Sequence, residues 1–351
     1  MQPLSAPNVR PGTGEMAHYP CRCTRILPRF FPCRAVVEAL HTSIPSAHRV
    51  QSLDEITSSM PLTSRRSSPG AFSALSRRQF LTLAGAAACS FAALPPLCSA
   101  GGIFDTYALD THEVPVPVRG LPLHLEGLTI AHITDTHLGK LGRLEEQVFT
   151  AVQAQNPAVI VLTGDMLSSR QALPALAAFC HALTAPGRHV LAIRGNHDVW
   201  TKVPVPDLRN LYQRAGARLL VNEHCVLNAG LTIVGTEDSV TKHYDLRTAL
   251  RGLPATPVRI HLSHAPEVFD WTAKPTMSFA LCLAGHTHGG QIRLPFLPPV
   301  VPWGAGPRFV AGWYPDTGMG PAYVSRGIGT SGIPLRFNCP PELPFLRLTR
   351  A

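Results

Sequence analysis

The chain has 351 residues, of which 45% are hydrophobic and 15% charged. That apolar fraction is enough to bury a core, which excludes wholesale disorder and collagen-like or coiled-coil classes. The formal charge of +9 suggests nucleic acid or an anionic membrane as a partner. However, residues 1–100 hold ten Arg, no Lys and four acids, and so carry two-thirds of the excess. The rest is mildly basic and has no basic run with interleaved aromatic residues, so we expect no nucleic-acid partner.

The first 100 residues do not predict a folded domain. Residues 1–59 are rich in Pro, Ser, Arg and Cys without periodicity, which indicates disorder or a start codon placed too far upstream, with Met60 as the natural start. Residues 60–100 contain Arg77 and Arg78, followed at 81–94 by an Ala-rich apolar stretch shorter than the roughly 20 residues of a membrane span.

Twin arginines before a short apolar stretch resemble a twin-arginine (Tat) export signal. The resemblance implies the Tat translocon as a partner during export, and a periplasmic or outward-facing, membrane-attached location. A cleavage point near Ala100 and an uncleaved anchor both stay open. The alternative to a signal is a buried helix that happens to follow two arginines.

Residues 101–351 predict one layered domain in which short apolar runs alternate with helical patterns. The expected helices cover 143–155 and 172–183. Strands that alternate with helices are typical of an α/β fold. The expected strands are 128–134, 158–163, 189–194, 231–235, 258–263 and 279–284.

Potential metal ligands follow five of these strands directly. Because residues i and i+2 of an extended segment point the same way, Asp135 and His137 can share one ion, and so can His286 and His288. Strand ends of α/β proteins gather at one edge of the sheet, and the oxygen and nitrogen donors there suit Mn, Fe, Zn or similar divalent ions. We expect the flanking glycines to allow tight turns. The donors are Asp135, His137, Asp165, Asn196, His264, His286 and His288.

The order of these motifs resembles the calcineurin-like metallophosphoesterases. That family's pattern is D-x-H, G-D, G-N-H-[D/E], a single His and G-H-x-H, and every element occurs between residues 135 and 288. The segments 285–291 (GHTHGGQ), 323–329 (YVSRGIG) and 340–342 (PPE) resemble the bacterial exported or membrane-associated branch. That branch includes Tat-exported phosphodiesterases and UDP-2,3-diacylglucosamine hydrolases of lipid A biosynthesis. The likeness covers roughly residues 105–349.

The resemblance implies a fold of two mixed β-sheets packed as a sandwich and flanked by helices. It also implies two metal ions that share Asp165: Asp135, His137 and His288 complete one site, and Asn196, His264 and His286 complete the other. A hydroxide that bridges the ions would attack phosphorus. His197 would face the leaving-group oxygen and donate a proton, and Asp198 could orient the His197 imidazole.

Several residues near the motifs have alternative interpretations. Gln291 and Arg326 belong to the branch-like segments and could contact substrate or serve the structure, and Arg143 is a weaker candidate for a substrate contact. His132 and His261 lie inside strands, so we expect packed or hydrogen-bonded side chains there.

The function expected from these residues is a dimetal phosphodiesterase. The alternatives are a hydrolase of the lipid-linked pyrophosphate in UDP-2,3-diacylglucosamine, and a non-catalytic scaffold, against which the complete ligand set argues. The apolar segment 294–303 (LPFLPPVVPW) could form a lip beside the site that suits a lipid or a membrane surface, or could be an ordinary packed loop.

Overall fold

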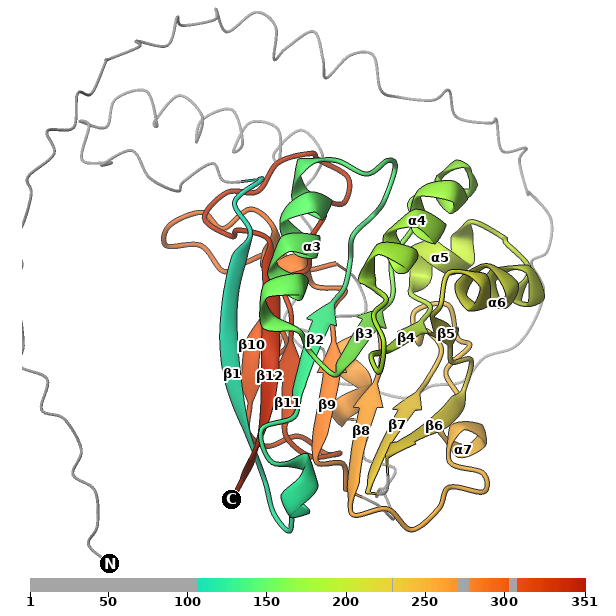
Figure 1. Ribbon diagram of the computed structural model, residues 1–351. Helices are drawn as coiled ribbons and strands as arrows, with labels where there is room; N and C mark the ends of the chain where they lie inside the picture. The colour runs from blue at the N-terminus through green and yellow to red at the C-terminus, as the bar shows by residue number, and fades with distance from the viewer. Residues whose placement is uncertain (1–105, 229, 271–277, 303–307) are drawn as a thin grey trace, which may run out of the picture. The chain divides into compact units, whose positions relative to one another are not determined.

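The computed structural model describes residues 106–228, 230–270, 278–302 and 308–351 (Figure 1). The expected upstream start, export signal and cleavage point therefore lie outside the described residues, as does Trp303. Among the helices that the structure does describe, none has both the length and the apolar character needed to cross a membrane.

Twelve strands of the described chain form two six-stranded sheets. The first sheet has the order β1 (Asp110–Val118), β12 (Glu342–Arg350), β2 (Thr129–Ile133), β3 (Val159–Thr163), β4 (His189–Ile193), β5 (Arg218–Leu219). The second has the order β10 (Gly312–Tyr314), β11 (Ala322–Val324), β9 (Leu281–Ala284), β8 (Val258–Leu262), β7 (Leu231–Gly235), β6 (Glu223–Asn228). Both are mixed, because β12 is antiparallel to β2, and β6 and β10 are antiparallel to their neighbours.

Strand alternation produces three hydrophobic cores, one between the two sheets and one on the outer face of each sheet. In β2, Ile130 faces the core between the sheets, whereas Ala131 and Ile133 face the helices. The helices α3 (Arg143–Gln155), α4 (Leu173–Leu183) and α6 (Val205–Arg214) pack there. The outer face of the second sheet packs against α7 (Leu246–Ala249) and the 3-10 helix η3 (Pro266–Asp270). This is the expected sandwich of two mixed sheets flanked by helices. The remaining helical segments are η1 (Leu123–Leu125), η2 (Arg170–Ala172), α5 (Asn196–Trp200) and η4 (His288–Gly290).

All six expected strands and both expected helices are present, with ends shifted by at most two residues. Strand β1 was not predicted, because Pro115 and Pro117 interrupt its pattern. It lies at the edge of its sheet and pairs only with β12, and an edge strand tolerates residues that lack an N–H.

The parallel strands β2, β3, β8 and β9 all point toward the same end of the sandwich (Figure 1). Hydrogen bonds join the sheets at this end, for example at His264 and His286. His264 Nδ1, after β8, lies 2.9 Å from the carbonyl oxygen of Thr163 in β3, and the His286 N–H, after β9, donates to Asp135 Oδ2 at 2.9 Å. Residues that leave both sheets therefore meet in one place.

Candidate metal centre

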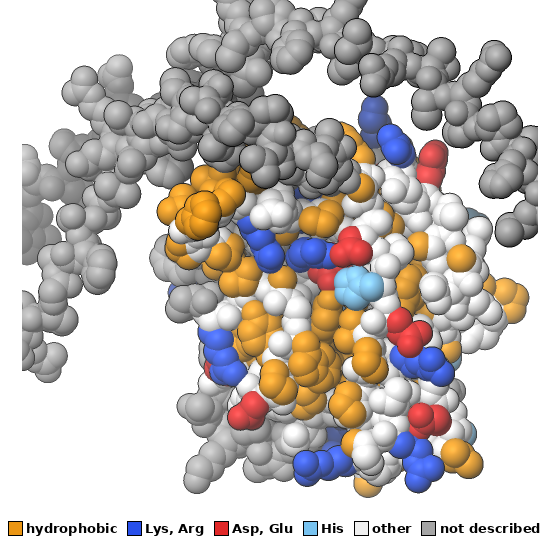
Figure 2. Space-filling model, turned by 90° about the vertical axis from the view of Figure 1, so that its left-hand side faces the viewer, with side chains coloured by type: hydrophobic (Ala, Val, Ile, Leu, Met, Phe, Trp, Pro, Cys, Tyr) orange, Lys and Arg blue, Asp and Glu red, His pale blue; other side chains and the backbone are white. Residues whose placement is uncertain are grey.

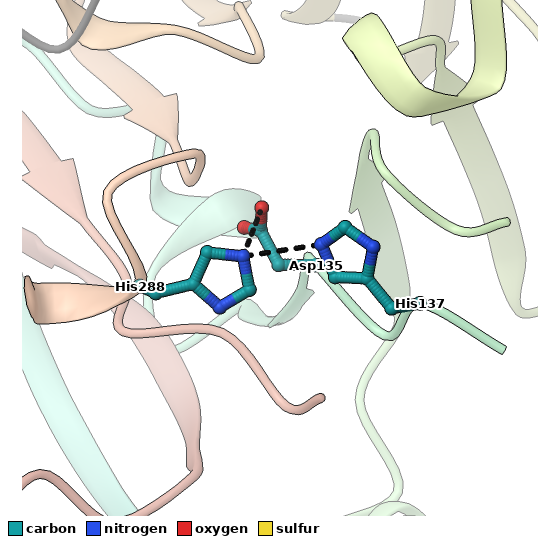
Figure 3. Close-up of side chains that lie close together, drawn as sticks. All are labelled: Asp135, His137 and His288. Atoms are coloured by element: carbon teal, nitrogen blue, oxygen red, sulfur yellow. Dashed lines mark hydrogen bonds and ion pairs between the residues drawn. The ribbon is translucent and has the colours of Figure 1, made fainter. Parts of the chain in front are cut away.

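One group of donors consists of Asp135, His137 and His288 (Figure 3). His288 Nε2 lies 3.1 Å from His137 Nε2 and 3.5 Å from Asp135 Oδ1. The first two residues follow β2 of one sheet, and His288 follows β9 of the other. Two imidazole nitrogens at this separation need a cation or a shared proton between them, so this group can hold a divalent ion.

A second group consists of Asp165, Asn196, His264 and His286. His264 Nε2 lies 3.1 Å from Asn196 Oδ1, 3.2 Å from His286 Nδ1 and 3.4 Å from Asp165 Oδ2. Asp165 also reaches the first group, because its Oδ2 lies 3.7 Å from His137 Nε2. The structure thus places His286 and His288 in different groups with Asp165 between them, as the resemblance implied.

Hydrogen bonds orient the ligand nitrogens. The carbonyl oxygen of Thr163 can only accept, so His264 Nδ1 carries the proton and its Nε2 presents a lone pair to the second group. His137 Nδ1 lies 3.1 Å from Ser168 Oγ, which leaves its Nε2 facing Asp165 and His288. Neutral histidines whose other ring nitrogen is held by a hydrogen bond are the usual ligands of Zn, Mn and Fe. The residues present therefore fit two divalent ions.

The backbone at the site is largely left-handed rather than extended. Asp135, Asp165 and His288 have φ angles of 52°, 50° and 49°, and His137 and His286 share this region. We expected the donors of each i, i+2 pair to point the same way because the segment is extended. The backbone there is not extended, so that reason was wrong. Each pair lies beyond its strand, in a conformation that costs of order 1–3 kcal/mol per non-glycine residue and that clusters at functional sites.

The glycines serve the site mainly through close approach. The glycines expected to form the tight turns are Gly164, Gly195 and Gly285, and of these only Gly164 has a positive φ, of 95°. A Cβ at Gly285 would overlap Asp135 Oδ2, and one at Gly195 would overlap Asp165 Oδ1. At these two positions the absent side chain makes room for a carboxylate.

Electrostatics show that the cluster attracts positive charge. Asp135 and Asp165 are 0% and 2% exposed. Burial opposes ionisation of Asp165, but His264 and His137 outweigh it and hold its pKa below the ordinary value. Burial likewise opposes protonation of His264, yet Asp165 raises the pKa of this imidazole well above the usual 6.5. Buried carboxylates that favour positive charge on a neighbouring imidazole are suited to bind cations.

Asp198 does not orient His197, so that prediction was wrong. Its Oδ1 accepts from Leu167 N at 2.9 Å, and its Oδ2 accepts from Gly195 N at 2.9 Å and Met166 N at 3.3 Å. No hydrogen bond joins it to the His197 ring, both residues being among those described. Burial, followed by the charge of Asp165, raises the pKa of Asp198 to about 7. This carboxyl therefore ties the turn after β3 to the turn after β4.

His197 lines a cavity of about 270 Å³ that opens over the cluster. Its ring centroid lies 4.6 Å from that of His137 and 4.8 Å from that of Trp200. The cavity is also lined by Asp165, Asn196, His286 and His288, and at its mouth by Trp200, Val240, Pro302 and Ser331. Sequence reasoning missed Trp200, Val240 and Ser331 because they belong to no motif, whereas Pro302 lies in the segment 294–303 that was expected as a possible lip beside the site.

The three expected substrate contacts do not line this cavity. Arg326 Nη2 binds Asp110 Oδ2 at 2.5 Å and its Nε binds Glu342 Oε2 at 3.1 Å. Gln291 Oε1 accepts from Ser331 N at 2.9 Å, and so positions a residue of the mouth. Arg143 begins α3 and is exposed. Structural roles therefore replace the expected contacts for Gln291 and Arg326.

Arg336 is a supporting residue that the sequence analysis missed. Its side chain is fully buried, and its Nη2 donates to the carbonyl oxygens of Gly329 at 2.6 Å, Arg326 at 2.8 Å and Gly327 at 3.1 Å. The same Nη2 lies 3.5 Å from His288 Nδ1. Gly329 N in turn donates to the Asp135 carbonyl at 2.8 Å. Arg336 therefore joins the two halves of the first metal group, and the signal for it was a lone arginine between Leu335 and Phe337.

His132 and His261 lie outside the metal groups, as expected. His132 Nε2 lies 2.8 Å from Thr163 Oγ1, and His261 Nε2 lies 3.1 Å from Thr236 Oγ1. Burial lowers the pKa of His132 to about 4 and that of His261 to about 3, so both are neutral packed side chains at pH 7.

Comparisons with known proteins show which family the chain is similar to. Residues 128–290 match the family model of the calcineurin-like phosphoesterases. The chain is 30% identical to the uncharacterized metallophosphoesterase YkuE of Bacillus subtilis over 78% of this chain and 98% of that protein. It is 28% identical to YkoQ of the same organism, over 64% of this chain and 85% of that one. A dimetal phosphatase from Danio rerio aligns over 58% of this chain and 88% of its own, with 12% identity and a TM-score of 0.37.

Replacing the residue between the two groups tests the metal centre. In Asp165→Asn we expect the metal content to fall from two divalent ions per chain to less than one, because the shared carboxylate charge is lost. Inductively coupled plasma mass spectrometry measures the ions, and the exposed Asp207→Asn on α6 is the matched control. Two ions retained in Asp165→Asn would refute the shared site.

Arg336→Lys tests the link between the halves of the first group. One ammonium cannot satisfy all the carbonyls that Arg336 binds, so we expect a loss of about 2 kcal/mol or more in the free energy of unfolding. Metal affinity should fall about 10- to 100-fold, since the support of His288 is disturbed. Urea unfolding and metal titration measure both, with exposed Arg143→Lys as control. Unchanged metal affinity would show that Arg336 only stabilises the fold.

Proposed function

Because the chain belongs to the calcineurin-like phosphoesterase family, we propose that it is a dimetal-dependent phosphodiesterase. Family membership and the donor groups make it a phosphoric ester hydrolase of the metal-dependent kind. The preference for diesters, and Mn, Fe or Zn as the ion, belong to this proposal.

The charge of the cavity lining is the observation that carries the diester assignment. Among the described residues that line it there is no Lys or Arg, and Trp200, Val240 and Pro302 form an apolar side. A phosphomonoester is a dianion with three non-bridging oxygens, one of which the two ions leave for a protein donor to bind. A diester has two such oxygens and one negative charge, so it needs no further cation and can place its second substituent against the apolar side.

The donor groups and His197 are placed so that they can act on a phosphoester bound in the cavity. Two divalent ions held by the donor groups would clamp the phosphoryl oxygens and lower the pKa of water. His197 lines the cavity from the start of α5, where it can donate a proton to the departing oxygen. His197 could instead bind metal, since its ring nitrogen lies within 4.8 Å of ligand atoms of His137 and Asp165. The metal content of His197→Ala separates the two roles, because only a metal ligand would lose an ion when it is replaced.

A second candidate is hydrolysis of a lipid-linked pyrophosphate such as UDP-2,3-diacylglucosamine. The apolar side of the cavity mouth favours it, because acyl chains need such a surface. We also propose export through the Tat translocon, for which residues 76–94 carry the sequence signal. Export conflicts with this substrate, which is made at the cytoplasmic face, and we therefore rank the phosphodiesterase first.

A substrate panel on the metal-loaded protein tests the proposal. We expect kcat/KM to be highest for a generic aryl phosphodiester, lower for a lipid-linked pyrophosphate and lowest for the matching phosphomonoester, for the charge reason given above. Initial-rate assays with equal metal loading measure it. Preference for the monoester would overturn the diester assignment, and a chain that binds two ions but turns over none of the three would favour a scaffold.

His197→Ala should retain both ions and lose about 10²- to 10⁴-fold in kcat on an alkyl diester, the range of a missing general acid. The loss should be smaller on a p-nitrophenyl diester, whose leaving group needs no proton. Exposed His181→Ala on α4 is the control. Loss of an ion from His197→Ala would make this residue a ligand instead, and full activity would remove it from the mechanism.

A further inference from the structure

An exposed apolar loop borders the cavity, here called the apolar loop and defined as residues 294–302. Its sequence LPFLPPVVP contains no charged or hydrogen-bonding side chain. Phe296, Val300 and Leu297 are 104%, 81% and 60% exposed. Nine large hydrophobic side chains are exposed in the described chain, and these three fall within five residues. The remaining six are scattered over other segments, so the concentration here is not a general property of the surface.

The loop is held in this position from its base. Pro299 packs so closely on Gly290 that a Cβ there would lie 2.6 Å from the Pro299 Cβ. Arg293 N donates to the Phe337 carbonyl at 2.9 Å, and Arg293 Nε donates to the Gly289 carbonyl at 2.6 Å. Phe296 at the tip has a φ of 67°, a conformation that aromatic residues rarely adopt. A backbone fixed at its base therefore presents apolar side chains to solvent.

The apolar loop is continuous with the candidate active site. Pro302 at one end lines the cavity together with His197 and Trp200. Gly290, which packs against Pro299 of the loop, belongs to η4, which begins with His288. The loop projects from the sandwich in Figure 1, and Figure 2, which views that side, shows hydrophobic side chains gathered at the upper left beside Lys or Arg side chains.

We propose that the apolar loop inserts into the surface of a lipid bilayer and brings phosphodiester head groups to the cavity. The inference rests on the proposed phosphodiesterase and names its substrate class, lipids in a membrane. Large apolar side chains with a basic residue at their base fit the boundary between acyl chains and head groups. Arg293 supplies the basic group, and there is no Asp or Glu from Gln291 to Pro302.

Two further features favour a bilayer over a protein partner. Trp200, 57% exposed at the cavity mouth, is the residue type most enriched at membrane interfaces. A stable protein interface buries about 800 Å² on each partner, formed by some 20–30 residues, whereas the exposed large side chains here are three on one loop. A loop tip suits a fluid surface that needs no matching shape.

The test uses the full chain and vesicles of phosphatidylcholine with phosphatidylglycerol. Phe296→Trp places a fluorophore at the tip, and its emission should shift to shorter wavelength when vesicles are added. Leu123→Trp is the matched control, since Leu123 is 76% exposed in η1, before β2. We expect no shift there. Because the chain already contains four Trp, each emission spectrum is taken as the difference from the unsubstituted chain with the same vesicles, so it reports on the introduced Trp alone.

A second measurement links the loop to turnover. In Phe296→Ser/Val300→Ser we expect cleavage of a vesicle-embedded diester lipid to fall about tenfold or more relative to a soluble aryl diester, because less apolar surface enters the bilayer. Turnover of the soluble diester is the reference for folding and metal loading.

The outcomes distinguish the two proposals. An unshifted Phe296→Trp emission, or an unchanged ratio of vesicle to soluble turnover in the double variant, would overturn the docking surface and leave the loop to a protein partner. A clear emission shift in a chain that cleaves no diester would uphold the surface and overturn the phosphodiesterase.

Discussion

The site depends on burying two carboxylates that have no basic side chain to pair with. Asp135 and Asp165 are almost inaccessible, and their only ion-pair partners among the described residues are histidines. A buried anion is costly unless a positive charge compensates it. In this chain the compensation is left to protons on imidazoles or to metal ions. The cluster is therefore a cation site first, and its hydrolytic chemistry follows from the ions it can hold.

The two sheets supply the rigidity that this arrangement needs. Five of the seven donors lie just beyond a strand in left-handed backbone, which persists only where the surroundings determine it fully. Hydrogen bonds from His264 to Thr163 and from His286 to Asp135 cross between the sheets. Asp198 ties neighbouring turns within the first sheet through three backbone N–H groups. The packed interior thus carries the conformational cost of the site.

The sequence predicted the strands and metal ligands that local patterns indicate, and it did not predict the contacts between residues far apart in the chain. Apolar runs located six strands, and the donors directly after them indicated a shared edge, but the prolines of β1 concealed an edge strand. The division of donors into two groups came from the resemblance, because spacing alone placed His286 with His288. The hydrogen bonds of the Arg336, Gln291 and Asp198 side chains reach partners up to 48 positions away, a separation in sequence that no local pattern encodes.

The cavity therefore has two parts with different tolerance for change. The cluster is so tight that a single added carbon at Gly285 or Gly195 would overlap a ligand carboxylate. The mouth is formed by Trp200, Val240, Pro302 and Ser331, of which Trp200 is largely exposed and Pro302 ends a loop whose tip makes little contact with the fold. Under the proposed function we expect substitutions there to change which substituent the cavity accepts without disturbing the donors. In that proposal reactivity resides in the strand ends, and selection among phosphoesters resides in the loops around them.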